Sequence, residues 1–440
     1  MQMFDPSIFR QALGRNLQRL WRNRLVRDGY WVLFGHLATI LAGIVSIRLY
    51  TELAPQAVFG AANLLLGTLT LAMQTIIAPV TQTQVRFHNT YSDSGKGDTY
   101  LNFIARLAGC AALATSSLLC FILLIWPSLR LGAGPSVVVW LLGWILVSTY
   151  RNVSINAIQA ERRQARYSAW LAAESGSQVL ATWFFLMLSP QVESYVAGQL
   201  FGMLLPAAIF ARRVPLSLTR TLNRDLRAEA LLQLISYGLP FALLSLLGWI
   251  SNLSDRYVLA TQLDAAAVGR YVAAFGIASR FPSMLGGILT DIFRPALFEA
   301  ENRSDRPRAS GLFRQWLLVA ALFGSFLVGV MFLAGDFLAE ILLAESYRSG
   351  ARTVMCWVAL GYACVNLSQI IENRLLSHNA SRILIVTKCC GAAANFAFAN
   401  LLIPTLGVNG AACANALGQF LQLIACVLAA LAYRHKHQPS

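Results

Sequence analysis

The sequence predicts an all-α protein whose helices cross a membrane about twelve times. Of the 440 residues, 57% are hydrophobic and only 12% are charged, about half the charged share of a soluble domain. Apolar runs of about 20 residues, long enough to cross a bilayer as a helix, recur along the whole chain. Basic residues concentrate in every second connecting segment, the pattern of polytopic membrane proteins.

The apolar runs form two sets of six. The first set covers 30–50, 57–84, 99–126, 136–159, 167–188 and 194–211, and the second covers 230–251, 266–293, 311–334, 351–375, 383–403 and 408–432. Segments on the side of both termini are rich in arginine, whereas the loops of the other side contain Arg130, Arg256 and Arg348. Because basic segments stay in the cytoplasm, we expect both termini there.

The chain divides into five predicted segments. They are an amphipathic basic cytoplasmic helix (1–29), an N-terminal lobe of spans one to six (30–213), a basic cytoplasmic linker (214–229), a C-terminal lobe of spans seven to twelve (230–433) and a cytoplasmic tail (434–440). In the first segment apolar residues recur at helical spacing among arginines, which suits binding to anionic lipid headgroups. A solvated basic tail is the alternative.

The two lobes show signs of an internal duplication. "SIRLY" (46–50) ends the first span and "SDRYV" (254–258) ends the seventh; the next span opens with "FG" (59–60) or "VG" (268–269). Six spans per lobe give both lobes the same orientation, so we expect parallel repeats about an axis normal to the membrane. Transporters built from such repeats bind their substrate between the halves, near the middle of the bilayer.

Several kinds of site are disfavoured by composition. The net charge of +15 follows the loops of the membrane topology, which argues against nucleic acid as a partner. The eight cysteines lie in apolar spans without a Cys-x-x-Cys pair, which is typical of small buried side chains rather than of metal ligands. There is no phosphate-binding Gly-x-x-x-x-Gly-Lys-[Ser/Thr] loop. We therefore expect no metal and no cofactor.

One embedded cation stands out. The stretch "RYVAAFGIASRFPSMLGGILTDIFRP" (270–295) places Arg280 near the centre of the eighth span, where an arginine costs about 2.5–3.5 kcal/mol on insertion scales. Asp291 and Arg294 follow on the same helical face. A guanidinium binds phosphate through paired, planar hydrogen bonds. We expect Arg280 to face an anion-accepting cavity between the lobes; a fixed internal salt bridge is the alternative.

Two spans carry stripes of amide side chains. Asn152, Asn156 and Gln159 follow one face of the fourth span, beside Arg151, and Asn366, Gln369 and Asn373 follow the tenth, beside Glu372 and Arg374. Amides suit sugar hydroxyls, but they also join helices without any ligand. Trp144 belongs to a group of tryptophans near the expected outer interface, for which an aromatic belt is favoured over a sugar-stacking platform.

Four titratable side chains are candidates for coupling to an ion gradient. They are Asp291, Glu372, Glu174 and His36. A carboxyl group within the membrane can bind a proton or sodium ion, and a histidine can carry a proton. Structural ion pairs of Asp291 with Arg294 and of Glu372 with Arg374 are equally compatible with the sequence, and a lone histidine is more often a packing residue.

The opening of the first repeat resembles a known family. "RLYTELAPQAVFGAANLLLGTLTLAMQTIIAPVTQTQVRF" (48–87) is similar to the start of bacterial polysaccharide (O-antigen-type) flippases, in which an Arg-Leu-Tyr span end precedes a Pro-x-x-x-Phe-Gly turn and a long second helix. "DRYVLATQLDAAAVGRYVAAFGIASR" (255–280) is the same unit in the second half. The resemblance covers nearly the whole chain. It implies the multidrug/oligosaccharidyl-lipid/polysaccharide exporter superfamily, with two six-helix lobes arranged as a V and alternating access.

The resemblance also implies a function. Flippases of this branch move undecaprenyl-pyrophosphate-linked oligosaccharides from the cytoplasmic to the outer leaflet of the bacterial cytoplasmic (inner) membrane, for O-antigen, lipopolysaccharide or other cell-surface polysaccharide biosynthesis. They are thought to use H⁺ or Na⁺ gradients and to work beside a glycan polymerase or glycosyltransferase. Arginines line their central cavity. The matching candidates here are Arg280, Arg151 and Arg48, and the embedded charges Arg294 and Arg374 extend this set.

Two alternatives stay open. A multidrug and toxin antiporter of the same fold would take organic cations, which the surplus of embedded basic residues disfavours. A polysaccharide polymerase or ligase would be expected to carry a large external loop with catalytic groups, but the longest external stretch, 335–350, is short and half apolar. We therefore predict a transporter without enzymatic activity.

Overall fold

The protein is all-α, as predicted. The computed structural model describes residues 24–211, 224–303, 305–378 and 381–437, and these ranges contain helices and turns but no strand. Twelve helical segments among them are long and apolar enough to cross a membrane, so this is a multi-pass membrane protein. Most of the amphipathic helix predicted over 1–29 lies outside the described residues. Its last residues, 24–29, begin the first long helix.

Six spans form the N-terminal lobe. They are α2 (Arg24–Leu53), a second span made of α3 (Gln56–Ala72), the π-helix η1 (Met73–Ile77) and α4 (Ala78–Asp93), and then α5 (Gly97–Ile125), α6 (Ser136–Ala160), α7 (Gln164–Leu188) and α8 (Val192–Phe210). A short 3₁₀ helix, η2 (Pro127–Arg130), follows α5. Within this lobe α7 packs extensively against both α2 and α8.

The other six spans form the C-terminal lobe. They are a seventh span made of α9 (Arg224–Gln233), the π-helix η3 (Leu234–Gly238) and α10 (Leu239–Gln262), and then α11 (Ala265–Asn302), α12 (Arg306–Leu342), α13 (Ala351–Ser377), α14 (Ser381–Leu406) and α15 (Val408–His437). The 3₁₀ helix η4 (Glu345–Tyr347) joins α12 to α13. In this lobe α15 packs against both α13 and α14.

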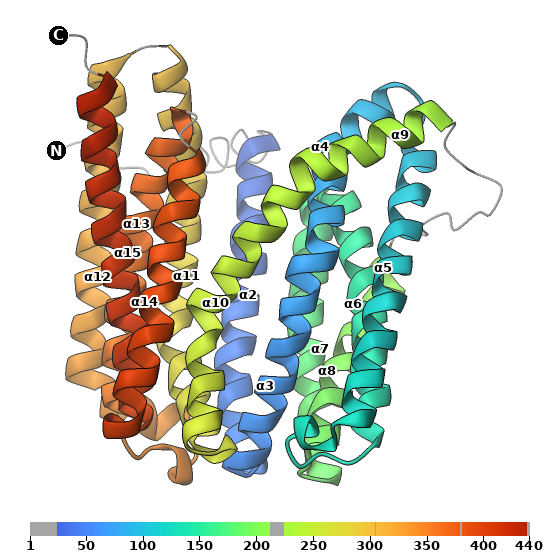
Figure 1. Ribbon diagram of the computed structural model, residues 1–440, viewed down its shortest axis with the longest axis vertical. Coiled ribbons are helices and arrows are strands. Elements are labelled where there is room, and N and C mark those ends of the chain that lie inside the picture. Colours follow the sequence, from blue (N-terminus) through green and yellow to red (C-terminus); the bar gives the residue numbers. More distant parts are fainter. Residues whose placement is uncertain (1–23, 212–223, 304, 379–380, 438–440) are drawn as a thin grey trace, which may run out of the picture.

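The seventh span runs diagonally from one lobe to the other (Figure 1). Ala230 of α9 belongs to a buried cluster with Tyr91 and Tyr100 of the N-terminal lobe, whereas α10 packs on α14. Of the linker predicted over 214–229, residues 224–229 are helical, and the apolar face of α9 packs onto the N-terminal lobe. The predicted tail is also partly helical, since α15 continues to His437.

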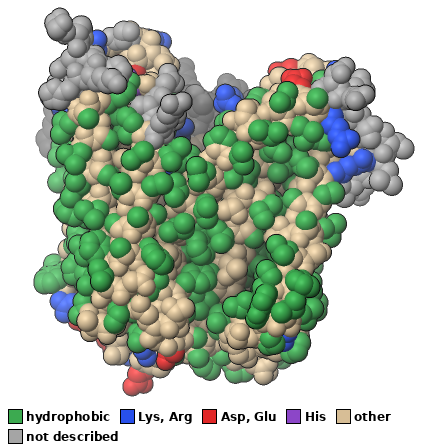
Figure 2. All heavy atoms as spheres, viewed as in Figure 1, with side chains coloured by type: hydrophobic (Ala, Val, Ile, Leu, Met, Phe, Trp, Pro, Cys, Tyr) green, Lys and Arg blue, Asp and Glu red, His purple; other side chains and the backbone are tan. Residues whose placement is uncertain are grey.

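The two ends of the molecule differ in how the lobes meet. We call the end with segments 93–97, 160–164, 302–306 and 377–381 the basic end, and the end with 53–56, 126–136, 262–265 and 342–351 the opposite end. The lobes diverge at the basic end, at the top of Figure 1, and converge at the opposite end. Figure 2 shows a notch in the molecular surface between the lobes at the basic end. The fold has the predicted V shape.

The lobes touch most closely where α3 crosses α11. A Cβ atom added to Gly60 would overlap the carbonyl oxygen of Ala265, and one added to Gly269 would overlap the carbonyl oxygen of Gln56. These two contacts exchange equivalent positions of the two repeats, so the pseudo-twofold axis passes through the crossing. Glycine at both positions allows the backbones to approach this closely.

Hydrogen bonds and apolar packing close the opposite end around this crossing. The Tyr347 hydroxyl donates to the carbonyl oxygen of Ala54 at 2.8 Å, and the Tyr257 hydroxyl donates to that of Leu64 at 2.8 Å. Burial raises the pKa of the Tyr347 phenol, so it stays a neutral donor. The largest apolar cluster of the described residues includes side chains of both lobes, such as Phe59 and Tyr271. These contacts join the lobes at the opposite end.

Candidate functional site

Arg280 lies near the middle of α11. Its guanidinium group packs directly against Gly43 of α2, on the other lobe, in space that a Cβ atom on Gly43 would occupy. The arginine is half-buried, and its Nε atom is buried without a hydrogen-bond partner among the described residues. No described carboxylate lies near enough to pair with it. In the described part of the chain, Arg280 is therefore an uncompensated cation rather than half of a salt bridge.

Two tyrosines of the N-terminal lobe lie beside this cation. The side chains of Tyr195 and Tyr50 lie near that of Arg280. Their rings meet edge to face with centroids 5.3 Å apart. The Tyr50 hydroxyl donates to the carbonyl oxygen of Gln178 at 3.0 Å. This chain of contacts leads from Arg280 to a pocket inside the N-terminal lobe.

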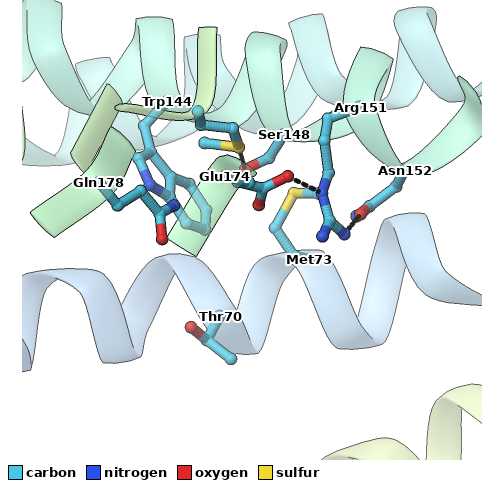
Figure 3. Close-up of a pocket in the computed structure, with 9 residues that line it drawn as sticks. Thr70, Met73, Trp144, Ser148, Arg151, Asn152, Glu174 and Gln178 are labelled. Carbon is cyan, nitrogen blue, oxygen red and sulfur yellow. Dashed lines mark hydrogen bonds and ion pairs between the residues drawn. The ribbon is translucent and has the colours of Figure 1, made fainter. Parts of the chain in front are cut away.

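The pocket lies halfway along the helices of the N-terminal lobe and has a volume of about 210 Å³. The residues that line it come from the second span (Thr70 and Met73), from α6 (Trp144, Ser148, Arg151 and Asn152), from α7 (Glu174 and Gln178) and from α8 (Met203). Figure 3 shows the polar groups turned toward the same space. The lining combines amides, hydroxyls, one aromatic ring and an ion pair.

The ion pair in the pocket joins Arg151 to Glu174. Arg151 Nε lies 3.0 Å from Glu174 Oε2, and Arg151 Nη1 donates to Asn152 Oδ1 at 2.9 Å (Figure 3). The Glu174 side chain is 11% exposed and that of Arg151 22% exposed. Arg151 and Glu174 were predicted as a substrate-binding cation and an ion-coupling acid. Their contact neutralises both charges in the observed conformation.

The other predicted cations lie elsewhere. Arg48 donates to the carbonyl oxygen of Leu343 at 2.6 Å and pairs with Glu52, so it joins the lobes at the opposite end. Arg374 lies 3.9 Å from Glu301 at the basic end of α13 and stacks on Phe313. Arg294 is exposed on α11, with its guanidinium over the ring of its helix neighbour Phe298. The structure brings none of these three to the pocket.

The predicted amides divide between the pocket and helix packing. Asn152 lines the pocket, whereas Asn156 and Gln159 lie farther along α6, half-buried and exposed, respectively. In the tenth span Asn366 donates to the carbonyl oxygen of Pro282 at 3.1 Å and thereby joins α13 to α11. Asn373 donates within its own helix to the carbonyl oxygen of Gln369, whose side chain is exposed.

The remaining ion-coupling candidates have different surroundings from those expected. Glu372 is buried but pairs with Lys388 at 3.0 Å and accepts a hydrogen bond from Gln422, so the suggested pair with Arg374 is wrong. Neighbours in sequence do not predict this contact, because Lys388 comes from the next helix, α14. Asp291 is exposed on α11. His36 is exposed on α2.

One buried acid was not among the residues predicted from the sequence. Asp255 is fully buried within the seventh span and accepts hydrogen bonds from the Tyr271 hydroxyl, from Asn415 at 3.2 Å and from the Arg256 backbone at 2.8 Å. The predicted apolar run ended at residue 251 with "SDRYV" at its end, whereas α10 continues to Gln262. The signal was the aspartate in "SDRYV", which replaces the isoleucine of "SIRLY" in the other repeat.

The family comparison agrees with this architecture. Residues 25–301, more than half of the chain, match the family model described as polysaccharide biosynthesis protein. The chain belongs to this family. The match confirms the resemblance found in the sequence. No curated protein sequence matches the chain.

Solved structures share the fold of this polysaccharide biosynthesis protein at low sequence identity. An inward-facing multidrug resistance MATE family transporter of the MOP superfamily superimposes with a TM-score of 0.72 at 15% identity, over 91% of this chain and 94% of that chain. The lipid II flippase MurJ in an inward closed conformation gives 0.70 at 12% identity, over 94% and 88%. An outward-facing MATE family transporter gives 0.63 at 15% identity, over 93% and 94%. These similarities confirm the predicted fold class.

Proposed function

We propose that this chain is a flippase for undecaprenyl-pyrophosphate-linked oligosaccharides. It would carry them from the cytoplasmic to the outer leaflet of the bacterial inner membrane, for the synthesis of O-antigen or another cell-surface polysaccharide. Membership of the polysaccharide biosynthesis family and the fold shared with a lipid II flippase support this class of substrate. The same comparisons favour a carrier over a polymerase or ligase.

The uncompensated charge of Arg280 carries the proposal. A cation held near the centre of a span is costly unless it meets water or an anion. Arg280 lies against α2 of the opposite lobe, and the described residues offer it no carboxylate. A diphosphate supplies two negative groups that a guanidinium binds with paired hydrogen bonds. Because Arg280 contacts the opposite lobe, an anion bound there would lie between the two lobes.

The direction of opening agrees with loading from the cytoplasm. The basic end, where the lobes diverge, carries most of the arginines of the connecting segments, and the positive-inside rule assigns such segments to the cytoplasm. Both termini would then lie inside. The higher TM-score against the inward-facing transporter than against the outward-facing one is consistent with this orientation. In the observed conformation the diphosphate would enter from the cytoplasmic leaflet.

Coupling to an ion gradient is the second part of the proposal. Asp255 replaces the earlier candidates as the most suitable acid, because it is fully buried and accepts hydrogen bonds from the neutral Tyr271 hydroxyl, the Asn415 amide and the Arg256 backbone, with the Arg256 guanidinium as a nearby charge. Glu174 and Glu372 each have a basic partner at 3.0 Å. Binding of H⁺ or Na⁺ to Asp255 would compensate its buried negative charge. Release of the ion would be favoured when the lobe rearranges.

Leaflet exchange in proteoliposomes tests the proposal. A polyprenyl-diphosphate oligosaccharide is incorporated, and its appearance in the other leaflet is compared for wild type, Arg280→Ala and Arg280→Lys. We expect loss of exchange in Arg280→Ala and partial activity in Arg280→Lys, because lysine keeps the charge without the paired donors. Normal exchange by Arg280→Ala would show that this cation does not bind the substrate.

A multidrug exporter is the second candidate, favoured by the similarity to MATE family transporters. Efflux of an organic cation from the same vesicles separates the two functions. The flippase assignment predicts no such efflux, since Arg280 is unpaired and Glu174 is neutralised by Arg151. Cation efflux without exchange of the lipid-linked sugar would replace the flippase with the exporter.

A further inference from the structure

The pocket of the N-terminal lobe has the chemistry of a site for one sugar ring. Its polar groups are mixed donors and acceptors: the amides of Asn152 and Gln178 and the hydroxyls of Thr70 and Ser148. Trp144 adds a flat apolar surface on which the carbon face of a sugar ring can stack. Its volume of about 210 Å³ lies below the roughly 300–1,000 Å³ of pockets for drug-sized ligands. It suits a single ring rather than a whole oligosaccharide.

The charge of the pocket favours a neutral polar ligand. Arg151 and Glu174 both line it, but their contact at 3.0 Å leaves no net charge. An organic cation would find no free carboxylate, and a separate anion would find no free guanidinium. The pair still presents charge-assisted hydrogen-bond groups to hydroxyls. Figure 3 shows it at one end of the pocket, with Trp144 and Gln178 at the other.

Several polar groups of the pocket have capacity for a ligand. The Gln178 side chain makes no hydrogen bond with the described residues, and Asn152 uses its oxygen toward Arg151 while its NH₂ group remains available. The Thr70 hydroxyl donates to the carbonyl oxygen of Leu66 at 2.8 Å and can still accept. These groups are half-buried and lie near the middle of the membrane, where such groups favour a polar partner over hydrocarbon.

The position of the pocket matches the chemistry of a lipid carrier. In a polyprenyl-diphosphate oligosaccharide the first sugar is bonded directly to the diphosphate, so its site must adjoin the anion site. The Tyr50 side chain lies near Arg280, and the Tyr50 hydroxyl donates to the backbone of Gln178, a residue of the pocket. A single side chain, that of Tyr50, therefore connects the two sites.

We propose that this pocket binds the sugar ring joined to the diphosphate while Arg280 binds the diphosphate itself. The proposal rests on the flippase function proposed above and adds a subsite to it. Trp144 is then a stacking platform rather than part of an interfacial aromatic belt. Specificity for the first sugar would arise in the N-terminal lobe, whereas the diphosphate is held by a cation of the C-terminal lobe.

Equilibrium binding to the full-length protein in nanodiscs tests the subsite with two probes. One is undecaprenyl diphosphate carrying a single N-acetylhexosamine, and the other is undecaprenyl diphosphate alone. We expect wild type to bind the sugar-bearing probe about ten-fold more tightly, which corresponds to about 1.4 kcal/mol. Trp144→Leu and Gln178→Leu should reduce this ratio to about one, whereas Trp144→Phe should retain most of it because phenylalanine keeps an aromatic face.

A neighbouring tryptophan provides the matched control. Trp140 lies one turn earlier on α6 and packs against Phe201 outside the pocket, so Trp140→Leu should keep the wild-type ratio. The thermal unfolding midpoint of each variant shows that it is folded, and Gln178→Leu serves if Trp144→Leu does not fold.

The possible results separate the subsite from the function. If wild type binds both probes equally, or if the ratio survives both Trp144→Leu and Gln178→Leu, the sugar subsite is wrong while the flippase function stands. If wild type binds neither probe, the flippase function fails and the subsite fails with it.

Discussion

The guanidinium group of Arg280 and the backbone of Gly43 are in direct contact across the two lobes. The arginine belongs to α11 and the glycine to α2, so the contact joins two residues that are 237 positions apart in the sequence. The contact gives the cation its position without giving it a counter-ion. Any side chain at position 43 would occupy the space of the guanidinium and displace it.

Gly43→Ala should move Arg280 without unfolding the protein. The added methyl group would meet the end of a flexible side chain, which can shift at little cost, rather than backbone. We expect lipid exchange in proteoliposomes to fall about ten-fold, a change of about 1.4 kcal/mol in the barrier, with a thermal unfolding midpoint close to that of wild type. Gly29→Ala on the same helix is the control, since nothing lies within 4 Å of its added methyl group. Wild-type exchange by Gly43→Ala would refute the importance of this contact.

Gly60→Ala should weaken the closure of the opposite end. Its Cβ atom would meet the backbone carbonyl oxygen of Ala265, which cannot move aside alone. Overpacking of this kind costs about 1–3 kcal/mol, so we expect a lower thermal unfolding midpoint. By the pseudo-symmetry of the crossing, Gly269→Ala should act in the same way. Gly109→Ala, at an open site on α5, is the control; a decrease in midpoint as large in this control would mean that the crossing is not special.

Arg151 and Glu174 should be energetically coupled. Each single change, Arg151→Gln or Glu174→Gln, leaves one buried charge unpaired. We therefore expect the losses of unfolding free energy of the two single variants to add up to more than the loss in the double variant. A double-mutant cycle on unfolding free energies should give about 0.5–3 kcal/mol of interaction energy. The exposed pair Arg352–Asp336, with side chains 42% and 75% exposed, is the control and should give less than about 1 kcal/mol. A coupling no larger than in the control would mean that the pocket pair is not structural.

Asp255→Asn should separate exchange from the ion gradient. The amide keeps the shape of the side chain and can still accept from Tyr271 and Asn415, but it cannot bind a proton or hold a sodium ion as a carboxylate does. We expect exchange driven by an imposed H⁺ or Na⁺ gradient to fall to the rate seen without a gradient. Asp291→Asn, at an exposed position of α11, should respond to the gradient as wild type does. If both variants respond normally, the coupling group lies elsewhere.

The sequence predicted the embedded arginine better than it predicted the other charges. Arg280 was singled out because its position in the span leaves it no route to the interface, an argument that needs only helix length and the cost of a charge in hydrocarbon. Arg48 and Arg374 lie closer to the ends of their spans, so the same argument applies to them less strictly. Their partners, the carbonyl of Leu343 and the carboxylate of Glu301, come from distant helices. A one-dimensional pattern contains no information on such contacts.

The acids show the same limit. Glu372 was paired in sequence with Arg374, two positions away, but two positions on a helix point in different directions. The structure pairs it with Lys388 of the next helix. Asp255 was missed for a different reason. Hydropathy ended the seventh span before it, whereas the observed helix continues and packing against α11 and α15 buries it.

The sequence alone determined the fold class, the number of spans, the two lobes and the family, since these follow from apolar length, charge distribution and repeated motifs, all of which are local along the chain. The tertiary structure decided which charges are paired, that Gly43 positions Arg280, that Gly60 and Gly269 form the crossing on the pseudo-twofold axis, and that residues of five helical segments enclose one polar pocket. Those features depend on distances between helices far apart in sequence. They are fixed only when the helices pack.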